Sequence, residues 1–240
     1  MRATAAGLSL RALIFDVDGT LADTEQEGHL PACNEAFASL GYPVRWSWED
    51  FKGMLRIPGN ARRMALALSR LEPPPAPEEL ATRVAALVER KRRLYVESYL
   101  PRLRLRPGVA ELVHEALARG LRLAIVSTSD EEQIKALLRH GFGDAAGRFE
   151  PILGQRAGVK TAADSPLYRR CLAALGPAPG ETLAIEDSEL GLRAARAAGL
   201  ACAVFYNDYT FGENFAEAAL VARSLAPFRL DLLAELCLGA

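Results

Sequence analysis

The sequence predicts an α/β protein in which a doubly wound, parallel sheet carries an inserted all-helical domain. Short apolar runs that end in polar residues recur along the chain, as buried parallel strands do. Segments with helical periodicity separate these runs, and this alternation is typical of a parallel sheet covered on both faces. A long stretch after the first run holds only helical patterns, which indicates a separate helical domain.

Four apolar runs are the candidate strands of the sheet. Each run is mostly apolar and is followed directly by a polar residue, which fits a strand that helices cover on both faces. The runs are residues 12–15, 121–126, 182–185 and 201–205.

One helix is predicted directly before the second of these strands, and another between the second and the third. Residues 109–117 place their apolar side chains on one helical face, with a proline before the stretch and a glycine after it. Another helix is expected to begin after Asp130, because Asp130 and Gln133 have the spacing of a capping box. Gly141 is expected to end this helix.

Residues 24–106 are predicted to form the helical insertion, and residues 1–23 and 107–240 to form the core that carries the sheet. Helical patterns cover roughly residues 27–40, 60–71 and 78–100, with a proline-rich break between the last two. The insertion holds 14 Lys and Arg against 10 Asp and Glu, and the remaining chain holds 15 against 20. We therefore expect a basic lid and an acidic core.

The composition is that of an ordinary globular protein. Of the 240 residues, 50% are apolar and 25% are charged, and the net charge is -1. A protein that binds nucleic acid nonspecifically needs a basic excess, which this chain lacks. We therefore expect a small partner molecule, with no nucleic acid and no membrane. We also expect a monomeric protein.

The expected location is the cytoplasm. The longest apolar stretches are far too short to cross a bilayer, and the opening residues 1–11 carry only a weak apolar run. The four cysteines lie far apart without a Cys-x-x-Cys pair, so they are expected to be reduced residues of the interior.

Polar residues that follow the predicted strands would meet at one edge of the sheet, where ligands of open parallel sheets bind. Several carboxylates at one place repel one another unless a hard cation joins them, and oxygen ligands suit Mg²⁺. The residues are Asp16 and Asp18 after the first strand, Ser127 and Thr128 after the second, and Glu186 and Asp187 after the third, with Lys160 in the preceding loop.

These motifs resemble the haloacid-dehalogenase superfamily. Members of that superfamily carry Asp-x-Asp after the first strand, then a Ser or Thr, a Lys, and an acidic pair. The resemblance covers about residues 10–205. The family usually has Lys-Pro-x-Pro-Asp, whereas this chain has Lys160-Thr-Ala-Ala-Asp164 and then Ser165-Pro166, so two residues appear as an insertion.

The resemblance implies that Asp16 attacks phosphorus and forms an aspartyl phosphate. Asp18 would protonate the leaving oxygen and then take a proton from water. Ser127 would donate a hydrogen bond to the phosphoryl group, and Lys160 would supply fixed positive charge. The Mg²⁺ ion would be held by Asp16, Glu186, Asp187 and the backbone carbonyl of Asp18.

The helical insertion stands where a lid lies in the subgroup of β-phosphoglucomutase, phosphoglycolate phosphatase and the CbbY-type sugar bisphosphate phosphatases. Trp46, Trp48 and the segment 55–64 are most similar to the CbbY type, in which Ala61 would be a Lys that Arg62 could replace. Lid closure would exclude water from the phosphate. The expected substrate-binding residues are Arg56, Arg63, Thr128 and His29, and His29 lies one position further along than in the proteins it resembles.

The resemblance thus implies a Mg²⁺-dependent phosphatase for a small sugar phosphate or sugar bisphosphate, with xylulose-1,5-bisphosphate as the expected substrate. A β-phosphoglucomutase-like mutase stays open, because the same aspartyl phosphate can return its phosphoryl group to another hydroxyl of the substrate. A phosphoglycolate phosphatase stays open as well. A phosphorylated signalling receiver gathers similar residues but lacks the helical insertion, and a silent scaffold would not need the intact acidic set.

Overall fold

The computed structural model describes residues 10–57, 59–162 and 164–237. Residues 1–9, whose weak apolar run bears on the expected location, lie outside the described residues. The chain divides into two compact units. We call the chain up to Ala22 and from Arg104 onward the sheet unit, and Asp23–Leu103 the helical unit.

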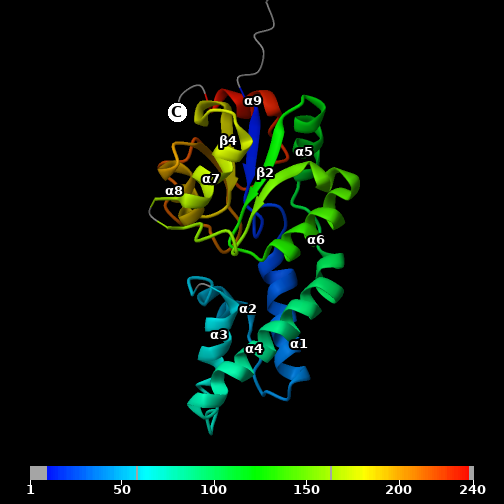
Figure 1. Ribbon diagram of the computed structural model, residues 1–240, viewed down its shortest axis with the longest axis vertical. Helices are drawn as coiled ribbons and strands as arrows, with labels where there is room; N and C mark the ends of the chain where they lie inside the picture. Colours follow the sequence, from blue (N-terminus) through cyan, green and yellow to red (C-terminus); the bar gives the residue numbers. More distant parts are fainter. Residues whose placement is uncertain (1–9, 58, 163, 238–240) are drawn as a thin grey trace, which may run out of the picture. The chain divides into compact units, whose positions relative to one another are not determined.

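The sheet unit contains a parallel sheet that confirms the predicted fold class (Figure 1). The described strands follow the order β3-β2-β1-β4-β5-β6. Their bounds are β1 Ala12–Phe15, β2 Arg122–Val126, β3 Phe149–Leu153, β4 Thr182–Glu186, β5 Ala201–Phe205 and β6 Leu220–Ala222. The four predicted strands correspond to β1, β2, β4 and β5.

The sequence did not predict the two edge strands. β3 contains Pro151, which cannot donate a ladder hydrogen bond and is tolerated at a sheet edge. β6 has only three residues. Both strands therefore lack the long apolar signal that marks the four inner strands.

Helices cover both faces of the sheet, which makes it doubly wound. α7 (Pro166–Leu175) and α8 (Glu189–Ala197) pack on the face that carries Ile14 and Val126. α5 (Val109–Ala118) and α6 (Glu131–Phe142) lie on the other side (Figure 1). The remaining helical segments of this unit are η4 Gly143–Arg148, η5 Pro179–Glu181 and α9 Leu230–Glu235.

The predicted limits of α6 are correct at its start and wrong at its end. Asp130 caps the helix by accepting a hydrogen bond from the backbone N–H of Glu132, at 3.0 Å. The helix continues past Gly141 and ends at Phe142, where Gly143 follows with a positive φ of 55°. A glycine with positive φ ends a helix, whereas Gly141 lies within the helix against Leu105.

The strand order reverses direction between β1 and β4. Phe15 of β1 lies opposite Ile125 of β2 on one side and opposite Ile185 of β4 on the other. The residues that follow these three strands are therefore neighbours at the carboxyl edge of the sheet. This reversal is the place where open α/β sheets bind their ligands.

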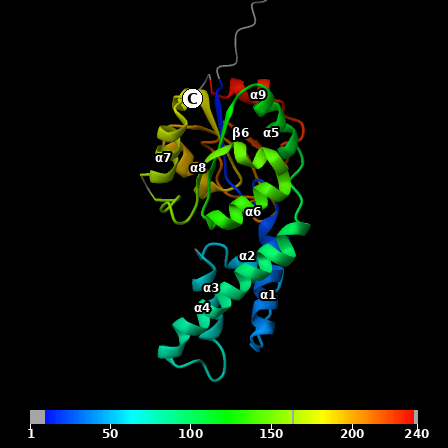
Figure 2. The same cartoon turned by 45° about the vertical axis from the view of Figure 1, so that its right-hand side comes forward.

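The helical unit is built around its longest helix, α4, which packs against α1 and α3 (Figures 1 and 2). Trp46 lies between the rings of Phe37 and Phe51, at 4.9 and 5.8 Å between ring centroids, so it packs the interior of this unit. The elements are η1 Glu25–His29, α1 Leu30–Ser39, α2 Trp48–Gly53, α3 Asn60–Leu68, α4 Pro77–Leu94, η2 Tyr95–Tyr99 and η3 Leu100–Arg102.

Two further findings bear on the predicted setting of the protein. Within the described residues, no helix combines the length and apolar character needed to cross a membrane. The four cysteines are all buried free thiols.

Candidate active site

Asp16 stands directly after β1, at the point where the strand order reverses. Its backbone N–H donates to the carbonyl of Ile185 at 3.0 Å, so the end of β4 fixes its position. The residue is only 5% exposed, and its Oδ2 accepts a hydrogen bond from Thr20 at 3.3 Å. Burial raises the pKa of the Asp16 carboxyl, and the nearby Asp18 raises it further against the opposing charge of Lys160.

Asp16, Glu186 and Asp187 form a buried cluster of carboxylates. Each residue offers an oxygen within 4.8 Å of the oxygens of the other two. Burial raises the pKa of Glu186 to about 7, and the charge of Asp16 acts in the same direction. Burial also raises the pKa of Asp187 well above its usual value, together with the charges of Asp16 and Glu186. The cluster therefore holds more negative charge than its surroundings stabilise.

Lys160 is the cation of the cluster. Its Nζ lies 2.6 Å from Oδ1 of Asp16 and 2.7 Å from Oε1 of Glu186. Burial alone would lower the pKa of this ammonium group, but the two carboxylates outweigh burial and raise it. Despite the two inserted residues after Lys160, its ammonium group lies between Asp16 and Glu186, two of the carboxylates that were predicted to meet here.

Glu186 is held on one oxygen and open on the other. Oε1 accepts hydrogen bonds from Lys160 and from the hydroxyl of Tyr168. Oε2 is buried with no hydrogen-bond partner among the described residues. A Cβ at Gly191 would overlap this carboxylate, so the glycine of the Glu-Asp-Ser-x-x-Gly sequence makes room for Glu186.

This cluster fits a hard divalent cation. Three buried carboxylates with one partnering lysine leave excess negative charge in a place that water solvates poorly. The unpartnered Oε2 of Glu186 is a further free oxygen donor. All the candidate donors are oxygens, as Mg²⁺ prefers. The Asp18 carboxylate is not part of this group, so Asp18 could contribute only its backbone carbonyl, as the sequence analysis expected.

The three residues that follow β2 differ in their contacts. Ser129 donates a hydrogen bond from its hydroxyl to Asp18 Oδ2. Ser127 is buried, and its hydroxyl accepts from the backbone N–H of Ser129 at 3.2 Å. Thr128 is exposed at the same edge of the sheet. Ser129 therefore links the second strand to the Asp-x-Asp motif, a role that the sequence analysis did not assign.

Two other contacts of the cluster were missed by the sequence analysis. Tyr168 comes from α7 and contacts Glu186. Asn207 comes from the segment after β5 and donates to Asp187 Oδ2 at 2.7 Å. The signal for Asn207 was available, because a polar residue near the end of a fourth strand follows the same rule as Asp16 and Glu186. Tyr168 follows the lysine motif in the sequence, but the sequence analysis assigned it no role.

His29 belongs to the helical unit. Its Nδ1 lies 2.8 Å from Nζ of Lys91, and its ring centroid lies 4.3 Å from that of Tyr95. His29 and Lys91 are both buried. His29 is the last residue of the π-helical turn η1.

The two arginines predicted to bind substrate differ in their surroundings. Arg63 is 7% exposed, and its guanidinium donates to the carbonyls of Ile57 at 2.9 Å and Leu55 at 3.2 Å. It also lies over the ring of Phe51. Arg56 is exposed in the turn that Arg63 holds. Arg63 thus shapes this turn, and Arg56 is the cation that the turn presents to solvent.

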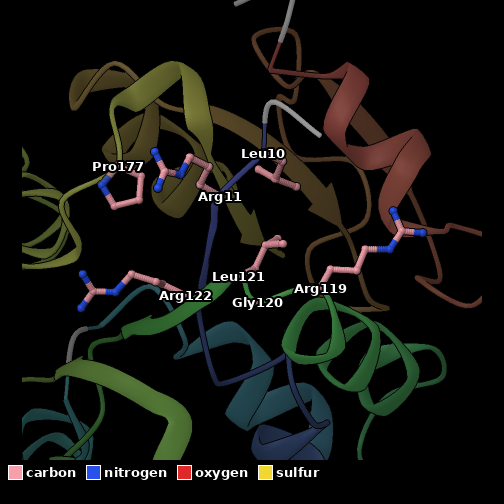
Figure 3. Close-up of a pocket in the computed structure, with 7 residues that line it drawn as sticks. All are labelled: Leu10, Arg11, Arg119, Gly120, Leu121, Arg122 and Pro177. Carbon is pink, nitrogen blue, oxygen red and sulfur yellow. The ribbon is translucent and has the colours of Figure 1, made fainter. Parts of the chain in front are cut away.

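A pocket of about 440 Å³ lies elsewhere in the sheet unit (Figure 3). Leu10, Arg11 and Arg122 line it before or at the first residues of β1 and β2, so it is at the amino edge of the sheet, opposite the carboxylates. Its third arginine, Arg119, points away from the other two and pairs with Asp231. The carboxyl edge, where the titratable cluster lies, is therefore the candidate active site.

Comparison with known proteins identifies the family. A sequence model described as haloacid dehalogenase-like hydrolase matches residues 10–199. The chain belongs to this hydrolase family. The matched range includes the carboxylate cluster, Lys160 and the helical unit, so the motifs on which the predicted resemblance rested lie within the shared region.

Within the haloacid dehalogenase-like hydrolases, the chain belongs with the CbbY-type proteins. It is 41% identical over 215 residues to protein CbbY of Rhodobacter capsulatus, and the match covers 88% of this chain and 92% of that protein. A variant of CbbY from Rhodobacter sphaeroides, solved in complex with xylulose-1,5-bisphosphate, is 39% identical with a TM-score of 0.76, covering 90% of this chain and 95% of that one.

The fold is shared more widely than the sequence. A β-phosphoglucomutase from Clostridium difficile is 19% identical, with a TM-score of 0.72, and the match covers 96% of this chain and 98% of that one. At this identity, the likeness shows the common fold alone.

Proposed function

We propose that this hydrolase is a Mg²⁺-dependent phosphatase that acts on a sugar bisphosphate through an aspartyl-phosphate intermediate. The observation that carries the proposal is the position of Lys160, within 2.7 Å of both Asp16 and Glu186 where the strand order reverses. A lysine between two carboxylates neutralises part of their charge and keeps one carboxylate ionised for attack on phosphorus.

Asp16 is the proposed nucleophile. Its backbone is fixed by β4 and its Oδ1 by Lys160, so its other oxygen, Oδ2, is the one that can reach a phosphoryl group. Thr20 donates only a long hydrogen bond to Oδ2, at 3.3 Å. Attack forms an oxygen–phosphorus bond to Asp16 as the bond to the leaving oxygen breaks.

Asp18 is the proposed acid and base. Protonated, it gives its proton to the leaving oxygen of the substrate, and ionised, it takes a proton from the water that hydrolyses the aspartyl phosphate. The hydroxyl of Ser129 holds Oδ2 of Asp18 and so sets the orientation of this carboxyl group.

Asp16, Glu186, Asp187 and the backbone carbonyl of Asp18 would hold a divalent ion, which would supply positive charge that offsets the repulsion between carboxylate and phosphate. The excess of carboxylates over lysine in the cluster supports this assignment. Lys160 adds a second, fixed positive charge beside the transferring group. Ser127, buried at the end of β2, is the proposed hydroxyl donor to a phosphoryl oxygen, and the exposed Thr128 a further contact with the substrate.

Xylulose-1,5-bisphosphate is the proposed substrate, because a CbbY protein 39% identical to this chain was solved with that molecule bound. A bisphosphate carries a second phosphate that needs its own cations. Arg56 and Arg62 are exposed on the helical unit and are the proposed contacts, with Arg63 shaping the turn between them. His29, whose ring contacts Lys91 within the helical unit, is a further proposed contact with the substrate.

The helical unit is proposed to be a lid, and the sheet unit the catalytic core. The proposed setting is a cytoplasmic monomer that acts on a small metabolite, without nucleic acid or membrane as partner. Four free thiols and a net charge of -1 support this setting.

Phosphate release from a panel of sugar phosphates, with Mg²⁺ and with a chelator, tests the proposal. We expect phosphate release with Mg²⁺ and none with the chelator, and the fastest release from xylulose-1,5-bisphosphate. Conversion of a sugar phosphate to its isomer without free phosphate would show a mutase instead. Preference for phosphoglycolate would contradict the proposed substrate and leave the reaction class standing.

A further inference from the structure

Asn207 is a buried polar residue that the catalytic motifs do not include. It lies two positions after β5 and is 7% exposed. Its side-chain oxygen, Oδ1, accepts hydrogen bonds from the backbone N–H groups of Tyr209 and Thr210, both at 3.1 Å, and from the hydroxyl of Thr210 at 3.2 Å. The backbone N–H of Asn207 in turn donates to the Thr210 hydroxyl at 3.0 Å. The residue is therefore fixed within its own turn.

This turn decides which way the side-chain amide faces. Backbone N–H groups can only donate, so the atom facing Tyr209 and Thr210 must be the amide oxygen. The amide nitrogen must then face the opposite direction, towards Asp187. Nδ2 lies 2.7 Å from Asp187 Oδ2 and 3.4 Å from the carbonyl oxygen of Gly19, and both of these atoms are acceptors.

The Asp187 side chain is closely confined beside the side-chain amide of Asn207. A Cβ at Gly19 would overlap Asp187 Oδ2, so the backbone of the Asp-x-Asp-Gly loop lies directly against that oxygen. The carbonyl of Gly19 is also held by the guanidinium of Arg106, which donates to Phe205 at 2.6 Å and Tyr206 at 2.8 Å as well. The end of β5 therefore joins the loop after β1 to the carboxylate after β4.

We propose that Asn207 is the positioning residue for Asp187. Its amide occupies Oδ2 of Asp187, so that Oδ1 is the oxygen left for the divalent cation. Asn207 thereby fixes one donor of the cluster at the geometry that Mg²⁺ requires, since this ion tolerates little deviation from ideal coordination. The inference rests on the proposed metal site and adds a residue to it.

Asn207→Ser tests this role. A serine hydroxyl can still accept from the turn amides, but it is too short to reach Asp187. We expect the Mg²⁺ dissociation constant, measured by titration calorimetry on the whole protein, to rise by about 10- to 100-fold. In turnover assays, the Mg²⁺ concentration for half-maximal rate should rise by a similar factor, while the rate at saturating Mg²⁺ falls only a few-fold.

Asn214→Ser is the matched control. Asn214 is exposed in the same segment, and its side-chain oxygen accepts a hydrogen bond from the backbone N–H of Ala216 at 3.1 Å. We expect its Mg²⁺ affinity to equal that of the unaltered protein. If Asn207→Ser does not fold, Asn207→Thr provides the same hydroxyl with more of the original volume.

The outcomes are separable. An unchanged Mg²⁺ affinity in a folded Asn207 variant would overturn the inference, even if the melting temperature fell, because the residue would then serve only its turn. Absence of Mg²⁺ binding in the unaltered protein would instead overturn the proposed metal site.

Discussion

The ammonium group of Lys160 lies 2.6 Å from Oδ1 of Asp16, a residue 144 positions earlier in the chain. Both side chains are buried, and Glu186 lies 2.7 Å from the same nitrogen. A buried cation shared by two carboxylates cannot be removed without leaving uncompensated negative charge. Lys160 should therefore affect both the stability of the site and the rate of the proposed reaction, and it is the first residue to test.

Lys160→Met should lower the rate of phosphate release by about 10²- to 10³-fold, because the transferring phosphoryl group loses a fixed positive charge. The variant should also melt at a lower temperature when Mg²⁺ is chelated, since Asp16 and Glu186 then repel each other. Lys135→Met is the control, because Lys135 is an exposed lysine whose pairing with Glu132 is on the surface. Equal rates for the two variants would exclude a catalytic role for Lys160.

Gly191→Ala should disrupt the site without altering any charged residue. The added Cβ would overlap the carboxylate of Glu186, which Lys160 and Tyr168 hold in place. We expect weaker Mg²⁺ binding and at least a tenfold lower rate. Gly180→Ala is the matched control, because nothing lies within 4 Å of a Cβ there. Full activity of Gly191→Ala would show that Glu186 can move at little cost.

Arg63→Ala and Arg56→Ala should distinguish a residue that holds a turn of the helical unit from a residue that supplies charge to the substrate. Arg63→Ala leaves the carbonyls of Leu55 and Ile57 without their buried donor and should destabilise this unit by about 1–3 kcal/mol. Arg56→Ala should change stability by less than about 0.5 kcal/mol, as exposed residues usually do.

The two arginine variants are compared on a sugar bisphosphate and on a small artificial phosphate ester. Arg56→Ala should raise KM for the bisphosphate about tenfold, the loss of one charge-assisted contact, and leave KM for the ester unchanged. An Arg56→Ala variant with an unaltered KM for both substrates would contradict a role in binding the second phosphate. Arg70→Ala, another exposed arginine of this unit, is the control.

Mg²⁺ should stabilise the protein more at about pH 8 than at about pH 5.5. Burial raises the pKa of Glu186 from its usual 4.5 to about 7, so the folded state binds this proton more tightly than the unfolded state does. The resulting stability is present below pH 4.5 and is lost as the pH rises through about 7. Asp16 and Asp187 are shifted in the same direction.

The measurement is the rise in melting temperature on adding Mg²⁺ at the two pH values. Bound protons compete with the metal, so the apparent Mg²⁺ affinity at the lower pH should be more than tenfold weaker. A rise in melting temperature that is the same at both pH values would show that these carboxyls do not bind the ion.

The inner strands of the sheet and the residues after them could be predicted because one physical cause produces both signals. A strand buried on both faces must be apolar, and the polar residues after it stand at the common carboxyl edge. This rule gave Asp16, Glu186 and Asp187. It did not extend to the edge strands β3 and β6, whose partial exposure and, in β3, a proline weaken the apolar signal.

Contacts that depend on packing could not be predicted in the same way. Tyr168 reaches Glu186 from the helix α7, and nothing in its local sequence distinguishes it from a core tyrosine. Arg63 was predicted to bind substrate, but its burial against Phe51 and the turn carbonyls appears only in the structure. Asn207 could have been found by applying the strand-end rule to β5.

The most direct test of the account is phosphate release by the unaltered protein and by Asp16→Asn, each with Mg²⁺ and xylulose-1,5-bisphosphate. Asn keeps the size of Asp16 but is a very poor nucleophile toward phosphorus. The account predicts release by the unaltered protein and none by Asp16→Asn, with circular dichroism spectra that coincide. Retention of more than about 5% of the rate by the folded variant would contradict nucleophilic catalysis by Asp16.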